Sequence, residues 1–369
     1  MAILLPRHAA RRWWLLYAGL AAIGCFGCTA QQNVKPHLQE PYPQKLSDWH
    51  LFTATSPALQ PNAGVLPYDL NTPLFSDYAS KYRFVWMPPG VSAQYHEDAP
   101  FDFPVGTILA KTFAFPVDGL ASERLVETRL LVHTRSAWIP LDYIWNQEQT
   151  EATLELVPDP VKVKWTSASG KTHDFTYVIP NSNECHECHD NNKTLLPIGP
   201  RARNLNKDYA YADGTENQLD RWSRLGYLRG LPAASARPRA AKWDDPSSGS
   251  LDERARAYLD NNCAHCHQPG GQAAYTGVDF RLPQREIAQQ GLCKSPNSAG
   301  FVGARSYDLV PGQPDDSILV FRLESTAPKI SMPQLSRDVV HEEGVKLLRE
   351  WIASLPGGCG PHSGKLSAD

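Results

Sequence analysis

The sequence contains one short pattern twice: two cysteines three positions apart, with a histidine directly after the second. Its members are Cys185, Cys188 and His189 in the first copy, and Cys263, Cys266 and His267 in the second. This pattern is the attachment signature of c-type haem. The two thiols bind the two vinyl groups, and the adjacent histidine is then held beneath the iron. We therefore predict two covalently attached haem c groups, with His189 and His267 as iron ligands.

Two other chemistries of paired cysteines fit the pattern less well. A zinc ribbon needs its two cysteine pairs about 15–20 residues apart, whereas these pairs begin at Cys185 and Cys263. A thioredoxin-type site needs no following histidine and lies in a βαβ pattern, which the sequence does not show. His186 and His265, inside the two motifs, are expected to be exposed rather than to bind iron.

A thioether is the second iron ligand that is typical of electron carriers. Met332 lies in the segment KISMPQL, just before the last expected helix, and we predict that it ligates the second haem. For the first haem four alternatives stay open: Met87, His133, His173 or no protein ligand. The segment GPRARNL, residues 199–205, is expected to support His189 by offering a backbone carbonyl to its Nδ1 proton.

The N-terminal segment and the net charge indicate the localisation of the chain and the partners it does not bind. Basic residues followed by the apolar run Trp13–Cys28 predict a signal peptide over residues 1–28. Cys25 or Cys28 then becomes a lipid-bearing N-terminus anchored to a membrane, most simply the outer membrane facing the periplasm. A plain signal peptide or an uncleaved anchor is the alternative. A net charge of -3 gives no affinity for polyanions, so nucleic acid is not an expected partner.

Cys293 and Cys359 remain once the motifs and the signal segment are accounted for. A disulfide between them is the expectation in an oxidising compartment, and two unpaired buried thiols are the alternative.

The secondary structure expected to position these residues changes from strands to helices along the chain. Four segments rich in β-branched and aromatic residues and a hairpin over residues 161–180 predict strands. Helices are expected over residues 216–228 and 251–262 and near the C-terminus. The predicted fold class is α+β multidomain, with an antiparallel β domain, haem-binding segments and a C-terminal, mainly α, cytochrome c-like domain. The expected order is signal peptide and lipobox 1–28, linker 29–61, β domain 62–180, first haem-binding segment 181–231, linker 232–250, cytochrome c domain 251–360 and tail 361–369.

Several segments together carry a resemblance. They are PLFSDYASKYRF (73–84), FPVGTILAKTF (103–113), ETRLL (127–131), CHECH with GPRARNLN, and the terminal MPQL and WI. Over nearly the whole mature chain, the sequence resembles a little-characterised family of bacterial dihaem c-type cytochromes. The resemblance implies an exported, redox-active protein with no established substrate.

These observations predict electron transfer in the periplasm between redox partner proteins that the sequence does not identify. The alternative is a dihaem enzyme of the peroxidase type, in which one iron keeps an open coordination position. A third hypothesis makes the β domain a binding module. Its site would comprise Asp77, Lys81, Arg83, Glu127 and Arg129, for which internal ion pairs are the simpler explanation.

Overall fold

The computed structural model describes residues 32–54, 59–118, 123–167, 170–297, 300, 302–335 and 337–360. The chain from Asn33 onward forms one compact unit. The predicted signal peptide with its lipobox cysteines and the predicted tail lie outside the described residues. No helix within the described ranges is long and apolar enough to cross a membrane.

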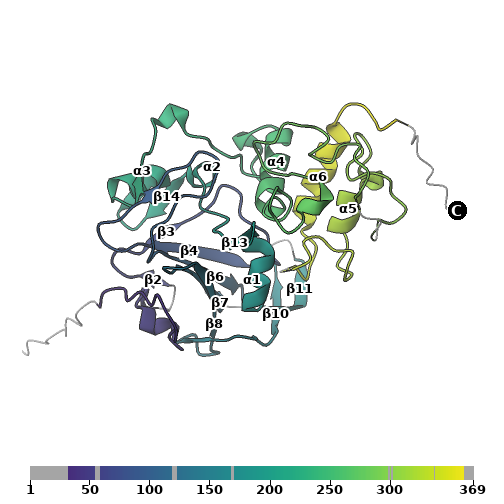
Figure 1. The fold of residues 1–369 in the computed structure, drawn as a ribbon. Helices are drawn as coiled ribbons and strands as arrows, with labels where there is room; N and C mark the ends of the chain where they lie inside the picture. Colours follow the sequence, from purple (N-terminus) through teal and green to yellow (C-terminus); the bar gives the residue numbers. More distant parts are fainter. Residues whose placement is uncertain are drawn as a thin grey trace, which may run out of the picture. The chain divides into compact units, whose positions relative to one another are not determined.

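A six-stranded antiparallel sheet forms the centre of the structure (Figure 1). In spatial order its strands are β3 (Leu66–Tyr68), β4 (Ser80–Trp86), β6 (Ile108–Phe115), β7 (Arg124–His133), β8 (Trp138–Trp145) and β9 (Ala152–Leu154). The four long strands occupy the segments that the sequence predicted. They pair in chain order, as expected for strands joined by short connections.

Both faces of this sheet are buried, and the side chains of each strand alternate between them. Phe84 and Trp86 belong to a hydrophobic cluster with residues from the N-terminal segment and η1 (Leu46–Trp49). Val85 and Met87 belong to a second cluster on the opposite face. The sheet therefore serves as a rigid platform that later segments of the chain cover.

Short strands extend the β structure around this platform. The predicted hairpin is present as β10 (Val161–Thr166) and β11 (Thr172–Tyr177). The other pairs are β1 (Phe52–Ala54) with β2 (Gln60–Pro61), β5 (Ala93–Gln94) with β16 (Leu228–Arg229), β12 (Asp190–Asn191) with β13 (Thr194–Leu195), and β14 (Asp208–Tyr211) with β15 (Gly214–Asn217).

Helices are few and short, and this corrects the predicted fold class. The α-helices are α1 (Ser182–His189), α2 (Ala202–Leu205), α3 (Gln218–Arg224), α4 (Leu251–Asn262), α5 (Ile318–Leu323) and α6 (Glu342–Ser354). The 3-10 turns beyond η1 are η2 (Ala234–Ala236), η3 (Pro246–Ser248), η4 (Ala274–Thr276) and η5 (Pro314–Asp316). Strands occupy 25% of the described residues and helices 21%, so the structure is mostly β with few helices.

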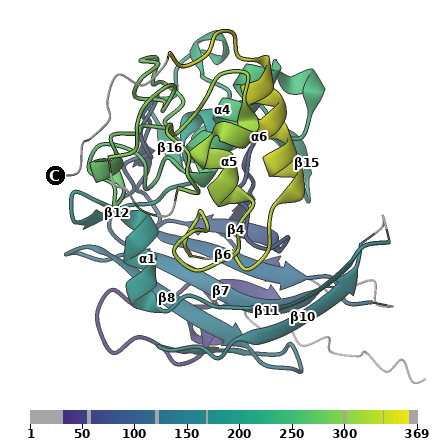
Figure 2. The ribbon, with the colours of Figure 1, turned by 90° about the vertical axis from the view of Figure 1, so that its right-hand side faces the viewer.

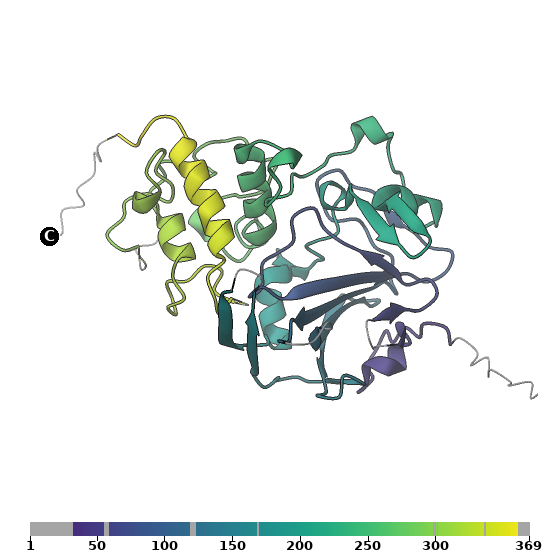
Figure 3. The ribbon, with the colours of Figure 1, turned by 180° about the vertical axis from the view of Figure 1, so that it is seen from behind.

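The expectation of a mainly α, cytochrome c-like C-terminal domain was wrong. The two long helices that the sequence indicated, α4 and α6, are present and pack side by side (Figure 3). Between them lies a long stretch in which turns, loops and the six-residue α5 predominate. The helical periodicity identified both helices correctly, but it carried no information about the irregular chain that joins them.

The C-terminal region nevertheless has a core of its own. Tyr258 of α4 and Leu348 and Trp351 of α6 belong to one buried cluster. A Cβ at Gly344 of α6 would lie 2.5 Å from the Tyr258 hydroxyl, so only glycine permits this close approach of the helices. Cys293 and Cys359 form the predicted disulfide.

A buried polar junction fixes α4 against the β-rich part of the chain. Arg203 of α2 donates two hydrogen bonds of 2.9 Å to the carboxylate of Asp260. The neighbouring side-chain amides of Asn204 and Asn261 exchange hydrogen bonds of 2.9 and 3.2 Å. All four residues are buried. The last turn of α4, which leads into the second cysteine motif, is therefore held in a defined place.

A second tie joins the sheet to the segment that precedes α6. The Oδ1 atom of Asp77 accepts hydrogen bonds from the backbone N–H groups of Asp338 and Val339, at 2.7 and 2.9 Å. The Oδ2 atom of Asp77 is buried and has no partner among the described residues. Burial raises the pKa of Asp77 from 3.8 to about 7.

This raised pKa predicts a pH-dependent stability. A carboxyl whose folded-state pKa exceeds its unfolded value contributes stability that is present below about pH 4 and is lost as the pH rises through 7. Asp77→Asn keeps the Oδ1 acceptor and removes the titration. Relative to the variant, the wild type should lose at most about 1.4 kcal/mol of unfolding free energy per pH unit between pH 4 and 7. Urea unfolding of both proteins across this range measures the difference, and parallel profiles would contradict the assignment.

Candidate functional site

The first cysteine motif lies on α1, which its own N-terminus stabilises. The Oδ1 atom of Asn181 accepts hydrogen bonds from the backbone N–H groups of Asn183 and Glu184. The Glu184 carboxylate accepts the Asn181 N–H at 2.8 Å, which completes a capping box. The helix lies over the sheet beside β8 (Figure 2), so a rigid element carries Cys185, Cys188 and His189.

The hydrogen bond of His189 determines which of its ring nitrogens is free. Its Nδ1 atom lies 2.8 Å from the Leu196 carbonyl oxygen. A carbonyl can only accept, so Nδ1 carries the proton and Nε2 keeps its lone pair. The sequence expected this carbonyl within residues 199–205, which was wrong. That segment instead contains α2 and the Arg203–Asp260 junction.

The second motif begins where α4 ends. Ser250 and Glu253 form a capping box at the start of α4, and the motif forms turns after Asn262. The Nδ1 atom of His267 lies 3.2 Å from Thr276 Oγ1. Thr276 donates its own hydroxyl proton to the Ala273 carbonyl at 2.7 Å, so its oxygen accepts from Nδ1–H. His267 therefore adopts the same tautomer as His189.

Both histidines are neutral near pH 7. Burial lowers the pKa of His189 and that of His267 from 6.5 to about 4. Among the described residues, neither Nε2 atom has a hydrogen-bond partner. A neutral imidazole whose Nδ1–H is already bonded and whose Nε2 is free is the state in which histidine ligates a metal.

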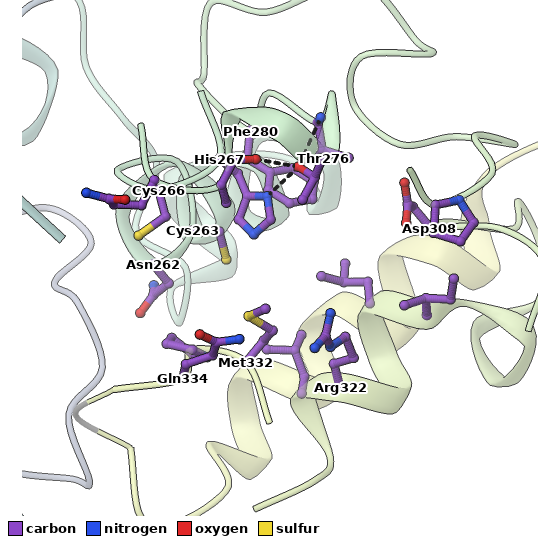
Figure 4. A pocket seen from close by; sticks show the side chains of 18 of the residues that line it. Asn262, Cys263, Cys266, His267, Thr276, Phe280, Asp308, Arg322, Met332 and Gln334 are labelled. Carbon is purple, nitrogen blue, oxygen red and sulfur yellow. Dashed lines mark hydrogen bonds between the residues drawn. The ribbon is translucent and has the colours of Figure 1, made fainter. Parts of the chain in front are cut away.

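A cavity of about 330 Å³ lies in front of the second motif. Figure 4 shows His267 and the two cysteines Cys263 and Cys266 on one side of it, and Met332 with Arg322 on the other. The loop that carries Met332 is anchored because the Met332 N–H donates to the Arg322 carbonyl at 3.1 Å. The predicted pairing of His267 with Met332 is thus compatible with the arrangement of the side chains.

The two motifs meet, which the sequence did not foresee. One ligand atom from each of Cys188, His265 and Cys266 lies within 4.8 Å of the other two. The Cys266 thiol also donates to the Glu187 carbonyl at 3.3 Å. Its hydrogen bond to Cys188 lowers the pKa of the Cys188 thiol and raises that of Cys266. His265 is buried, at 6% exposure, against expectation, whereas His186 is exposed as predicted.

A row of charged side chains crosses the sheet near the first motif. Arg83, Lys111, Arg129 and Asp142 lie directly opposite one another on β4, β6, β7 and β8. Arg129 binds the buried Glu127 carboxylate through two hydrogen bonds of 2.6 and 2.7 Å. Lys111 has no carboxylate partner among the described residues, and its Nζ atom lies 4.6 Å from the ring centroid of Phe113. Burial lowers the pKa of Lys111 well below its usual value.

The five residues of the hypothetical β-domain binding site make internal contacts. Arg83 pairs with Asp69 at 3.1 Å, and Lys81 donates to the Ala79 carbonyl. Asp77 binds backbone N–H groups, and Glu127 pairs with Arg129, as described above. Internal pairing, the simpler of the two explanations, accounts for these contacts.

The three side chains considered as the second ligand of the first haem have other surroundings. Met87 is 2% exposed and lies in the cluster with Val85 and Leu109. His133 stacks on Trp138, with ring centroids 4.4 Å apart. His173 stacks on Trp165 in the same way, at 4.3 Å.

Several residues of the site escaped sequence reasoning. The Leu196 carbonyl, Thr276 and Arg322 belong to common residue types at positions without a motif. The proximity of His265 to Cys188 depends on how the chain folds between the motifs. Comparison with protein-family models, with curated proteins and with solved structures finds no match for this chain. The case for a function therefore comes from the site alone.

The surroundings of Met87 generate a prediction. Met87→Ala removes a buried side chain and should lower the free energy of unfolding by about 2–5 kcal/mol. Met332 is only partly buried, so Met332→Ala should cost clearly less and serves as the matched control. Denaturant titration compares the variants, and equal losses would contradict a core role for Met87.

Proposed function

We propose that the chain is a dihaem c-type cytochrome that transfers electrons in the periplasm. The observation that supports this most strongly is the shared state of the two motif histidines. Each follows its cysteine pair directly, each has its Nδ1–H bonded by an acceptor, and each keeps Nε2 free.

The residues present fit the proposed group. Two cysteine pairs supply the thiols for four thioether bonds, and His189 and His267 supply the two proximal ligands. Leu196 and Thr276 hold the imidazole rings in orientation and make them stronger donors. Soft sulfur on one side and imidazole on the other is a ligand set of electron carriers.

Haem c held in this way supplies reversible one-electron chemistry at iron. The chain's own contribution at the second motif is to fix both axial donors. Arg322 secures the Met332 loop, and Thr276 secures His267. A donor pair that is held in place changes little between oxidation states, which keeps the reorganisation accompanying electron transfer small.

Charge near the first motif supports the same proposal. A haem brings two carboxylates, which need cationic or hydrogen-bonding partners when they are partly buried. Lys111 lies close enough to His189, and Arg129 close enough to Cys185, to lower the pKa of each electrostatically. Arg129 is already paired with Glu127, whereas Lys111 has no carboxylate partner among the described residues. Burial holds the pKa of Lys111 well below its usual value. In the proposed function a haem carboxylate near Lys111 would favour its charged form and pair with it.

Export and anchoring belong to the proposal as well. Covalent haem attachment takes place outside the cytoplasm, and the N-terminal residues 1–28 have the pattern of a signal peptide with a lipobox. A lipid at Cys25 or Cys28 would keep the haem-bearing part near a membrane surface, where redox partner proteins are found.

Met332 provides the test. A thioether favours ferrous over ferric iron, so Met332→Ala should lower the reduction potential of one of the two haems. The weak red absorption band of ferric haem with histidine and methionine ligands should also disappear. Spectroelectrochemistry measures both quantities.

Met87→Ala is the control, since it should change neither the band nor the potential. A Met332→Ala protein with an unchanged potential and band would contradict the assignment of the ligand. A wild type with native high-spin iron that turns over peroxide would contradict the carrier in favour of an enzyme.

A further inference from the structure

We propose that Cys188 and Cys266 hold the edges of the two haems against each other, so that the haems form one coupled redox unit. This inference rests on the proposed function and adds to it the route by which an electron passes within the chain.

The geometry starts from the second cysteine of each motif. The Sγ atoms of Cys188 and Cys266 lie within 4.8 Å of each other and of a His265 ring nitrogen. The cavity in front of His267 is lined by Glu187 and Cys188 of the first motif as well. One cavity is therefore lined by thiols from both motifs.

Because each cysteine sulfur would be bonded to its own haem, the proximity of the two sulfurs would place the edges of the two haems close together. Each sulfur, once attached, is one carbon away from the edge of its own porphyrin. Two such sulfurs within 4.8 Å of each other would bring the two conjugated edges into close range. With haem at both motifs, one electron could then pass between the two irons, one being oxidised as the other is reduced, without any co-reactant.

Contacts outside the sulfurs hold the two motifs together. The Asn192 N–H donates to the Gly270 carbonyl at 2.8 Å, and the Asn191 amide donates to the Pro269 carbonyl at 3.2 Å. His265 lies buried at the junction, and its Nδ1 atom has no hydrogen-bond partner among the described residues. The segments after both motifs therefore lie directly against each other.

Gly270 offers a way to separate the motifs. Its φ is +82°, and a Cβ there would lie 2.7 Å from the Asn192 side-chain nitrogen and 2.8 Å from Asn191 Oδ1. Gly90 has the same φ of +82° but has open space around it. Gly270→Ala and Gly90→Ala thus impose the same backbone strain, and only the first pushes the two segments apart.

The experiment uses the full chain with its haems attached. Intact mass first counts the haems in the wild type and in each variant. Circular dichroism in the Soret region then reports excitonic coupling between haems. A redox titration reports whether the charge on one haem shifts the potential of the other.

The wild type should carry two haems, show a bisignate Soret signal and titrate as two interacting centres. Gly270→Ala should reduce the signal and the interaction at an unchanged haem count, while Gly90→Ala should leave both as they are. Asn191→Ala removes the hydrogen bond to Pro269 between the motifs, and the one from Asn192, without adding bulk. It should act in the same direction as Gly270→Ala, with a smaller effect.

The possible outcomes distinguish a failure of the proposed function from a failure of the proposed coupling between the haems. A wild type without covalent haem refutes the proposed function itself. Two haems with a simple Soret signal and independent titration refute the coupling and leave the function intact. A Gly270→Ala protein that keeps both haems and full coupling refutes the role of this contact.

Discussion

The buried pairing of Arg203 with Asp260 is the constraint on which the site depends. It joins a helix that covers the sheet to the last turn of α4, and the second cysteine motif starts three residues after Asp260. Removing one partner of such a pair leaves an unpaired buried charge at a cost of about 3–5 kcal/mol. The pair therefore specifies one position for α4, and with it the meeting of the two motifs.

A common principle links the two motifs, although their local structures differ. One lies within a helix and the other follows the end of a helix, yet both histidines present the same free nitrogen. In each case an acceptor several residues further along the chain accepts a hydrogen bond from Nδ1–H. The acceptor is the Leu196 carbonyl for His189 and the Thr276 hydroxyl for His267. Different backbones thus reach the same imidazole state, which is the state that the proposed haem ligation requires.

The sequence predicted the local features of the structure well. A high content of β-branched and aromatic residues identified β4, β6, β7 and β8, and helical periodicity identified α4 and α6. Cysteine counting identified the Cys293–Cys359 disulfide. The strand and helix signals depend on residues that are close together in the sequence, and the disulfide follows from the number of cysteines. A single sequence is therefore sufficient to detect them.

What the sequence missed depends on contacts between distant segments. The C-terminal region was expected to be mainly α because two good helices flank a stretch that has no period of its own. The carbonyl that binds His189 comes from Leu196 rather than from the proline-containing segment after it. The burial of His265 and the contact of Cys188 with Cys266 follow from the α2–α4 junction, which no local pattern encodes.

The most direct measurement of the central claim is the covalent haem content of the chain exported in a cell that attaches haem c. Intact mass and peptide mapping should find two haems per chain, one on the peptide with Cys185 and Cys188 and one on that with Cys263 and Cys266. A chain that folds with four free thiols, or that retains a metal ion in the Cys188–His265–Cys266 cluster instead, would contradict the account.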